Sequence, residues 1–158
     1  MGSRGRLRDM GEPHSLKPVV LLNEVFPGDT NSMNTLYGGR LMSIMDTAAG
    51  MVSSKFAHSE FVTISIDALK FRRPAYQGDI IRTTARVVWT SPHTAGVHVV
   101  SCRLSRSEWE GEEICSGFFF MCAIDSEMRP TEIPQFAPST DQEKDLGDRA
   151  QAARDAMG

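Results

Sequence analysis

Asp46 is the residue of this sequence best placed to do chemistry. It lies within residues 36–56, where apolar residues recur at the three- and four-residue spacing of one helix face, and it stands beside that apolar stripe. A carboxylate in partly apolar surroundings is one that an enzyme can use as a general base or a nucleophile. A boundary aspartate that faces solvent is also compatible with these residue types, so both interpretations stay open.

Gly38 and Gly39 come directly before this helical pattern, and Gly39 precedes Asp46 by seven residues. The first N–H groups of a helix have no partner within it, and glycine allows a ligand to approach them closely. Such N–H groups favour a carbonyl oxygen that is becoming an oxyanion. Two helical turns separate the glycines from Asp46, which places both on one side of the helix and within the span of a substrate. A tight turn that needs glycine is the structural alternative.

Polar and basic residues flank this helix on both sides in the sequence. The loop before it carries Asn31 and Thr35, which suit the orientation of a water molecule but are also common in turns. Arg72 and Arg73 follow an alternating segment; they suit a phosphate-bearing ligand and, equally, a solvated strand end. The four histidines lack metal-ligand spacing and the three cysteines lack a Cys-x-x-Cys pair, so we expect no metal site.

The elements that must position these residues follow from the period of the apolar pattern. We expect the long helix over residues 36–56 and strands near 17–26, 62–71, 81–89, 96–107 and 114–124. The alternation changes phase near Asp67, which predicts a β-bulge, and residues 77–79 are typical of a turn. Within 81–89, strict alternation places Ile81 and Trp89 on the same face. One long helix followed by strands in hairpin succession predicts an α+β fold with an antiparallel sheet of five or six strands.

Length and composition favour one domain in the cytoplasm. The 158 residues include 20 acidic and 17 basic ones, a balance that disfavours a nucleic-acid partner. The longest apolar run, residues 118–124, is far shorter than the ~20 residues of a membrane span, and no signal peptide is evident. We expect residues 1–14 to form a disordered leader, 15–136 the folded domain, and 137–158 a polar tail that is disordered or a short helix. A single helix covers only one face of such a sheet, which predicts self-association.

Several short motifs between residues 21 and 134 follow one another in a specific order. They are PGDTN at 27–31, TLYGGRLM at 35–42, MD at 45–46, VTISID at 62–67, FRRP at 71–74, GD at 78–79 and AID at 123–125. This order resembles that of the hotdog-fold acyl-CoA thioesterases of the hexameric bacterial and cytosolic type. The resemblance implies a central helix wrapped by the sheet, dimers whose two sheets join, and a hexamer of three dimers with active sites at the dimer interfaces.

The resemblance also implies roles for the residues named above. Asp46 would activate the hydrolytic water or attack the thioester directly, while N–H groups near Gly39 polarise the carbonyl. Asn31 and Thr35 would position the water. The residues expected to bind acyl-CoA are Gly38, Arg72, Arg73, His93 and Thr94. Hydrolysis to a fatty acid and coenzyme A would need no cofactor or metal, because coenzyme A is part of the substrate.

Two other functions remain compatible with the sequence. Other hotdog enzymes hydrate or dehydrate acyl thioesters, and many of those pair a histidine with an acid, whereas residues 36–56 contain no histidine. An acyl-CoA sensor would bind without hydrolysis; such sensors usually carry a DNA-binding extension, and neither end of this chain resembles one. The partners expected are therefore acyl-CoA and further copies of the chain, and neither nucleic acid nor a membrane.

Overall fold

The computed structural model describes residues 12–157, except the side chain of Ala68. Most of the leader predicted for residues 1–14 lies outside this range. The elements in chain order are β1 (Val19–Glu24), a short 3-10 helix η1 (Pro27–Asp29), α2 (Gly38–Ala57), β2 (Glu60–Phe71), β3 (Ile80–Thr90), β4 (Thr94–Leu104), β5 (Gly111–Ile124) and α3 (Asp141–Ala156). Among the described residues, no helix combines the length and apolar content needed to cross a membrane.

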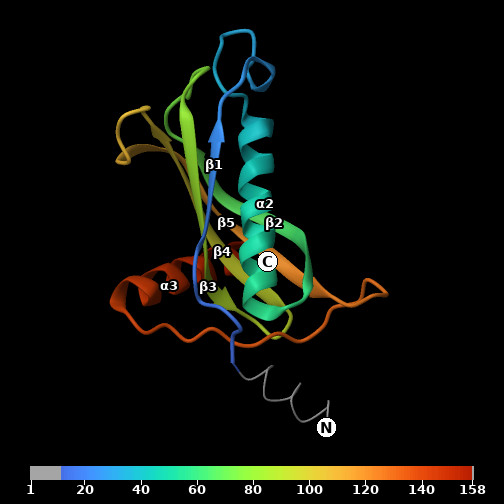
Figure 1. Ribbon diagram of the computed structural model, residues 1–158. Helices are drawn as coiled ribbons and strands as arrows, with labels where there is room; N and C mark the ends of the chain where they lie inside the picture. The colour runs from blue at the N-terminus through green and yellow to red at the C-terminus, as the bar shows by residue number, and fades with distance from the viewer. Residues whose placement is uncertain (1–11, 158) are drawn as a thin grey trace.

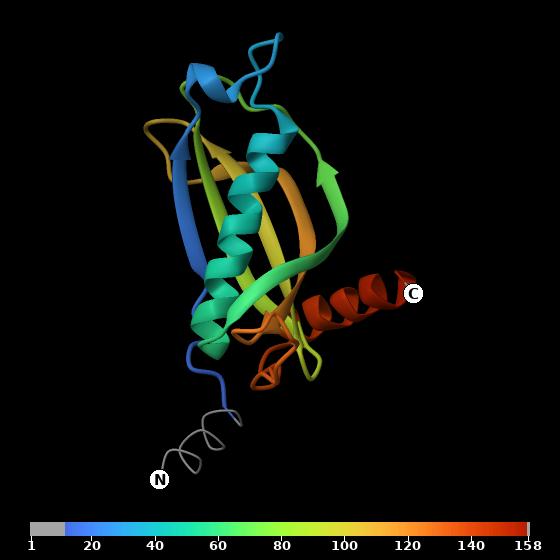
Figure 2. The same ribbon diagram turned by 90° about the vertical axis from the view of Figure 1, so that its right-hand side faces the viewer.

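The strands form one antiparallel sheet that curves around α2. Its order is β1-β3-β4-β5-β2, so the two strands nearest α2 in sequence, β1 and β2, are the two edges. Figures 1 and 2 show α2 lying along the concave face while β2 curls beside it. The predicted α+β fold with one long helix wrapped by an antiparallel sheet is confirmed, with five strands.

Small and apolar side chains fix α2 against the sheet. Met45, Ala48 and Ala49 are fully buried and pack in one cluster with sheet residues such as Val99 and Phe119. Alanine at two successive buried positions lets the helix axis approach the sheet closely. The helix ends where His58 adopts the left-handed conformation, with φ of 50°. α2 is therefore part of the core and holds any side chain it carries in a fixed place.

Two irregularities bend β2. The pairing of β2 with β5 shifts register between Asp67 and Lys70, which confirms the bulge predicted near Asp67, and also between Thr63 and Ser65. At the second site Ile64 has no partner on β5 and its side chain is 45% exposed. Bulges increase the local twist and bend of a strand. The one at Ile64, which the sequence pattern did not reveal, shapes the stretch of β2 that passes α2.

The opposite face of the sheet is covered in part by α3, and Figure 1 shows the strands between α2 and α3. α3 buries Leu146, Ala150 and Ala153 in a cluster with aromatic residues of β5. Trp89 packs in this cluster and not beside Ile81, contrary to the prediction from strict alternation. The reason is a register shift between Val87 and Trp89, which turns the end of β3 toward α3.

Candidate active site

Asp46 lies midway along α2, half-buried, on the side of the helix that faces β2. Its Oδ1 accepts a hydrogen bond from the Thr63 hydroxyl on β2. Thr63 pairs with Met121 of β5, just before the bulge at Ile64, and its Oγ1 lies 3.5 Å from the Met121 sulfur. The carboxylate is thus held by one hydroxyl donor among apolar neighbours, which is the setting that the sequence indicated for a reactive acid.

Thr63 was missed by the sequence analysis. Nothing in residues 62–67 distinguishes it from the other hydroxyl residues of an alternating strand. Its contact with Asp46 depends on the path of a bulged strand past a helix, and this path is a tertiary property. The MD and VTISID motifs each contain one member of the pair, but their spacing alone does not bring them together.

The start of α2 presents free backbone donors. The N–H groups of Gly38 and Gly39 have no hydrogen-bond acceptor among residues 12–157, and the N-cap residue, Tyr37, supplies no side-chain bond. The Tyr37 ring lies over Gly39, where an added Cβ would stand 3.1 Å from it. A side chain at residue 39 would therefore displace the tyrosine, so glycine keeps these donors accessible.

Backbone contacts anchor this helix start. The Leu36 N–H donates to the Ala75 carbonyl at 2.8 Å, and the Tyr37 N–H donates to the Asp29 carbonyl at 3.1 Å. The Arg40 Nε lies 3.2 Å from the Asp29 carboxylate, which ties η1 to the first turn. A donor pair fixed before the ligand arrives needs little reorganisation when charge develops on that ligand.

The loop before α2 is closed by Asn31 and Thr35. The Asn31 Nδ2 donates to Thr35 Oγ1 at 2.8 Å, and Asn31 Oδ1 accepts from the N–H groups of Met33 and Thr35 at 2.9 and 3.2 Å. Both predicted water-positioning residues thus lie together, as expected of neighbours in a turn. Thr35 keeps its hydroxyl proton for a further acceptor, and Asn31 keeps one amide proton.

Within one subunit, the Gly39 donors and the loop of Asn31 lie far from Asp46 along α2. Gly39 and Asp46 are seven residues apart in a regular helix, which is about 10 Å along its axis. Reacting atoms must approach to about 3–3.5 Å, so one subunit cannot place its Gly39 donors and its Asp46 on the same thioester. Asn31 belongs to the loop that precedes α2, and Figure 1 shows this loop beyond the start of the helix.

The predicted coenzyme A ligands fall at two ends of the sheet. Arg72 and Arg73 follow β2, near the start of α2, where they pair with Glu113 and Glu112 at 2.8 and 3.9 Å. His93 and Thr94 lie at the β3–β4 turn, at the other end, where Thr94 pairs with Cys122 and is buried. The Arg72 N–H bonds to Ile114, eight residues from Cys122 on β5, which is about 26 Å along a strand.

Other reactive groups are poorly placed for catalysis. Burial raises the pKa of the Cys115 thiol to about 11, so it stays protonated and is a weak nucleophile. In the part of the chain that the structure describes, no three His, Cys, Asp or Glu side chains gather as a metal site would require. Asp46 is a half-buried acid on the central helix, and the Thr63 hydroxyl of β2 holds its carboxylate.

Comparison with known proteins identifies the family of the chain. A model of the thioesterase superfamily matches residues 33–108. The uncharacterized acyl-CoA thioester hydrolase YkhA of Bacillus subtilis is 34% identical over 125 residues, which are 79% of this chain and 73% of that protein. The structure of a hexameric acyl-CoA thioesterase superimposes with a TM-score of 0.84 at 29% identity, covering 91% of this chain and 92% of the other.

A second solved structure carries a ligand. It is an acyl-CoA hydrolase from Staphylococcus aureus in complex with butyryl-coenzyme A and coenzyme A, with a TM-score of 0.83 and 28% identity. The superposition covers 91% of this chain and 88% of that enzyme. The chain belongs to the thioesterase superfamily, among its acyl-CoA thioester hydrolases.

Proposed function

We propose that this protein hydrolyses acyl-CoA to a free carboxylic acid and coenzyme A, with Asp46 as the general base or nucleophile. The observation that carries the proposal is the half-buried Asp46 carboxylate, held by Thr63 on the helix that the sheet encloses. Membership of a family of acyl-CoA thioester hydrolases supports the substrate class.

The chemistry needs no group beyond the chain and water. As a base, Asp46 takes a proton from water while the water oxygen attacks the thioester carbon, and the carbonyl oxygen becomes an oxyanion. The N–H groups of Gly38 and Gly39 stabilise that oxyanion. The C–S bond then breaks, coenzyme A leaves as a thiolate, and the proton held by Asp46 restores the thiol. As a nucleophile, Asp46 would instead form an anhydride that water hydrolyses.

The site requires two copies of the chain. Because Gly39 and Asp46 of one subunit lie about 10 Å apart along α2, a thioester held by the Gly39 donors of one subunit must meet Asp46 of the partner subunit. Asn31 and Thr35 lie in the loop that leads into the Gly39 end of α2 and would position the water from there. The hexameric assembly named for the similar thioesterase is consistent with this requirement, and we propose a hexamer built from such dimers.

The same three residue types occur at the same spacing in the Staphylococcus aureus hydrolase. Structures of that enzyme include alanine variants of an Asn, an Asp and a Thr, the first two 15 residues apart and the last two 17 apart. Asn31, Asp46 and Thr63 have these spacings here. This agreement supports a site composed of the three residues, with Thr63 orienting Asp46.

Coenzyme A would extend from this site across the surface. Arg72 and Arg73 near the helix start are suited to phosphate groups, once their present partners Glu113 and Glu112 are displaced or shared. His93 and Thr94 lie too far from the two arginines to bind the same part of coenzyme A within one subunit. They would therefore contact the ligand from a neighbouring copy. Bacterial and cytosolic acyl-CoA thioester hydrolases are among the relatives, which supports a cytoplasmic location for this protein.

Thiol release is the decisive measurement. The protein is incubated with acetyl-, octanoyl- and lauroyl-CoA in the presence of a thiol-reactive dye, and release is compared with that of Asp46→Asn. We expect kcat of the variant to be lower by about 100-fold or more, because an amide neither accepts the water proton nor attacks the thioester. Saturable binding without release by the wild type would identify a sensor, and an Asp46→Asn enzyme as fast as the wild type would refute the mechanism.

Mixing two inactive variants tests the two-copy site. Asp46→Asn and Gly39→Val are co-expressed so that mixed dimers form. A mixed dimer contains one site with an intact Gly39 from one subunit and an intact Asp46 from the other, so activity returns in the mixture. If each site uses one subunit, the mixture stays as inactive as the parents.

A further inference from the structure

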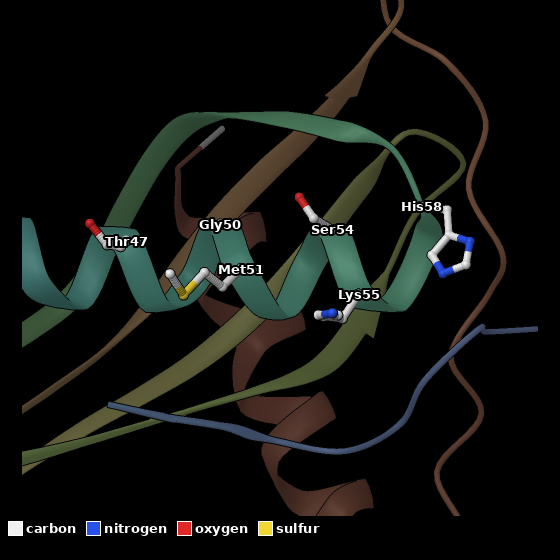
Figure 3. A pocket seen from close by; sticks show the side chains of 6 residues that line it. All are labelled: Thr47, Gly50, Met51, Ser54, Lys55 and His58. Atoms are coloured by element: carbon white, nitrogen blue, oxygen red, sulfur yellow. The ribbon is translucent and has the colours of Figure 1, made fainter. Parts of the chain in front are cut away.

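The outer face of α2 carries a groove that the site above does not use. It is an open, shallow groove with a volume of about 490 Å³, lined by Thr47, Gly50, Met51, Ser54, Lys55 and His58, which follow one another at helical spacing. Figure 3 shows these side chains along the helix, with β2 arching past one side of it. From Gly50 to His58 the groove extends for about 12 Å along the axis.

Gly50 is the unexplained residue of this groove. Glycine in a helix interior costs roughly 0.5–1 kcal/mol relative to alanine. Nothing within the subunit demands that cost: an added Cβ at Gly50 would find only the Met121 methyl, at 4.0 Å, which is ordinary contact. Gly50 has no positive φ either. A space kept empty without a structural reason in the subunit indicates that something else occupies it.

The position of Gly50 connects the groove to the reacting group. It lies one helical turn after Asp46, and residues four apart are neighbours on a helix surface. Any side chain at residue 50 would therefore stand between Asp46 and the rest of the groove. Beyond Gly50 the wall is formed by Met51 and Ser54, so the groove leads away from the carboxylate.

The chemistry of the wall suits a flexible apolar chain. Met51 is the one large apolar side chain of α2 that is exposed, at 47%, and methionine adapts its shape to ligands. The Thr47 hydroxyl already donates to the Ser43 carbonyl at 2.9 Å, so it requires no polar group on a ligand. Lys55 at the far end can lay its methylene stem along the groove and keep its charge in water.

We propose that this groove receives the acyl chain of the substrate, that Gly50 is the residue that admits it, and that acyl chains long enough to run along its length of about 12 Å are the class that fills it. The inference rests on the proposed hydrolysis at Asp46 and adds the specificity of that reaction. A helix of a second copy is the other possible occupant, and the experiment below distinguishes the two.

The test compares substrate profiles of Gly50 variants. The ratio of kcat/KM for lauroyl-CoA to that for butyryl-CoA is measured for the wild type, Gly50→Ala and Gly50→Leu. We expect the ratio to fall about tenfold or more in Gly50→Leu and less in Gly50→Ala, in the order of added volume. Met51→Ala widens the groove and should raise the ratio. Ala152→Leu, which adds similar bulk to an exposed position of α3, is the matched control and should leave it unchanged.

Folding and assembly are followed in the same samples by thermal melting and light scattering. Gly50→Ala should melt higher than the wild type, since it removes the cost of helical glycine. The inference is overturned if neither Gly50→Leu nor Met51→Ala changes the ratio, or if Gly50→Leu lowers all substrates alike while the assembly dissociates. Those results leave the hydrolysis itself intact; only a wild type that releases no coenzyme A from any substrate would remove the proposed function.

Discussion

α2 and α3 pack on opposite faces of one sheet, and they do so in different ways. α2 buries nine of its twenty residues and packs in one cluster with residues of all five strands, whereas α3 buries three of its sixteen. The contacts of α3 are supplemented at its surface: the Trp89 indole N–H donates to Gln151 at 2.6 Å, and the Arg149 guanidinium lies 5.6 Å from the Phe118 ring centre. Asp46 thus lies on the helix that cannot leave without unfolding the domain, and the other face is covered by a helix held by few contacts.

The largest difference between the two helices should appear when each loses a buried side chain. Met45→Ala on α2 removes a fully buried side chain and should lower the free energy of unfolding by about 2–5 kcal/mol. Leu146→Ala on α3, at 9% exposure beside a smaller cluster, should cost less, because its surroundings can relax toward solvent. Urea denaturation at one protein concentration measures both. Equal losses would show that α3 is as much a part of the core as α2.

The sequence predicted the α2 side of the molecule better than the α3 side, for a physical reason. A twenty-residue helix buried along one stripe leaves a strong periodic signal, and Asp46 beside that stripe could be singled out from it. α3 buries mainly two alanines and one leucine, so residues 137–158 look polar in sequence although residues 141–156 form a helix on the sheet. The Thr140 hydroxyl does accept the Glu143 N–H at 3.1 Å, as a capping box would require.

Bulges account for the remaining differences between the strands predicted from the sequence and those observed. The pattern indicated the one near Asp67, where apolar residues change phase, but not those at Ile64 and before Trp89. At Ile64 the residue moved out of the ladder is itself apolar, so alternation continues in sequence while the strand bends in space. The pairing of Thr63 with Asp46 depends on that bend and could not be predicted from spacing.

A fall in pH should lower the stability of the packing around α3 more than that of the packing around α2. His98 on β4 lies half-buried under α3, opposite Arg86 on β3 and 5.0 Å from the Phe118 ring on β5. Burial lowers the pKa of His98 from its usual 6.5, Arg149 and Arg86 lower it further, and Glu113 opposes them. The unfolded chain therefore binds a proton at a higher pH than the folded one, so stability is full above about pH 6.5 and declines as the pH falls toward the lowered value.

His98→Gln isolates this effect. Its free energy of unfolding should depend less on pH between about 7.5 and 5.5 than that of the wild type, because the titrating group is gone. His93→Gln removes an exposed histidine and should keep the slope of the wild type. A slope unchanged by His98→Gln would mean that His98 stays neutral, or is equally protonated, in both states. Hydrogen exchange of the α3 amides identifies whether the acid-sensitive step is release of that helix.

The smallest effect is expected at the polar contact that joins α3 to the end of β3. Trp89→Phe keeps most of the ring that packs edge-on against Phe120 but loses the indole N–H that donates to Gln151. Because Gln151 is exposed and water can replace the bond, the loss should be about 0.5–1 kcal/mol or less. A double-mutant cycle with Gln151→Ala separates the bond from the packing: a coupling energy near zero would leave the aromatic contact alone to hold the end of α3. In either case the loss of stability should appear as faster hydrogen exchange of the α3 amides, while the α2 amides stay protected. The reason is that Trp89 packs in the cluster of α3, whereas α2 packs in a separate cluster.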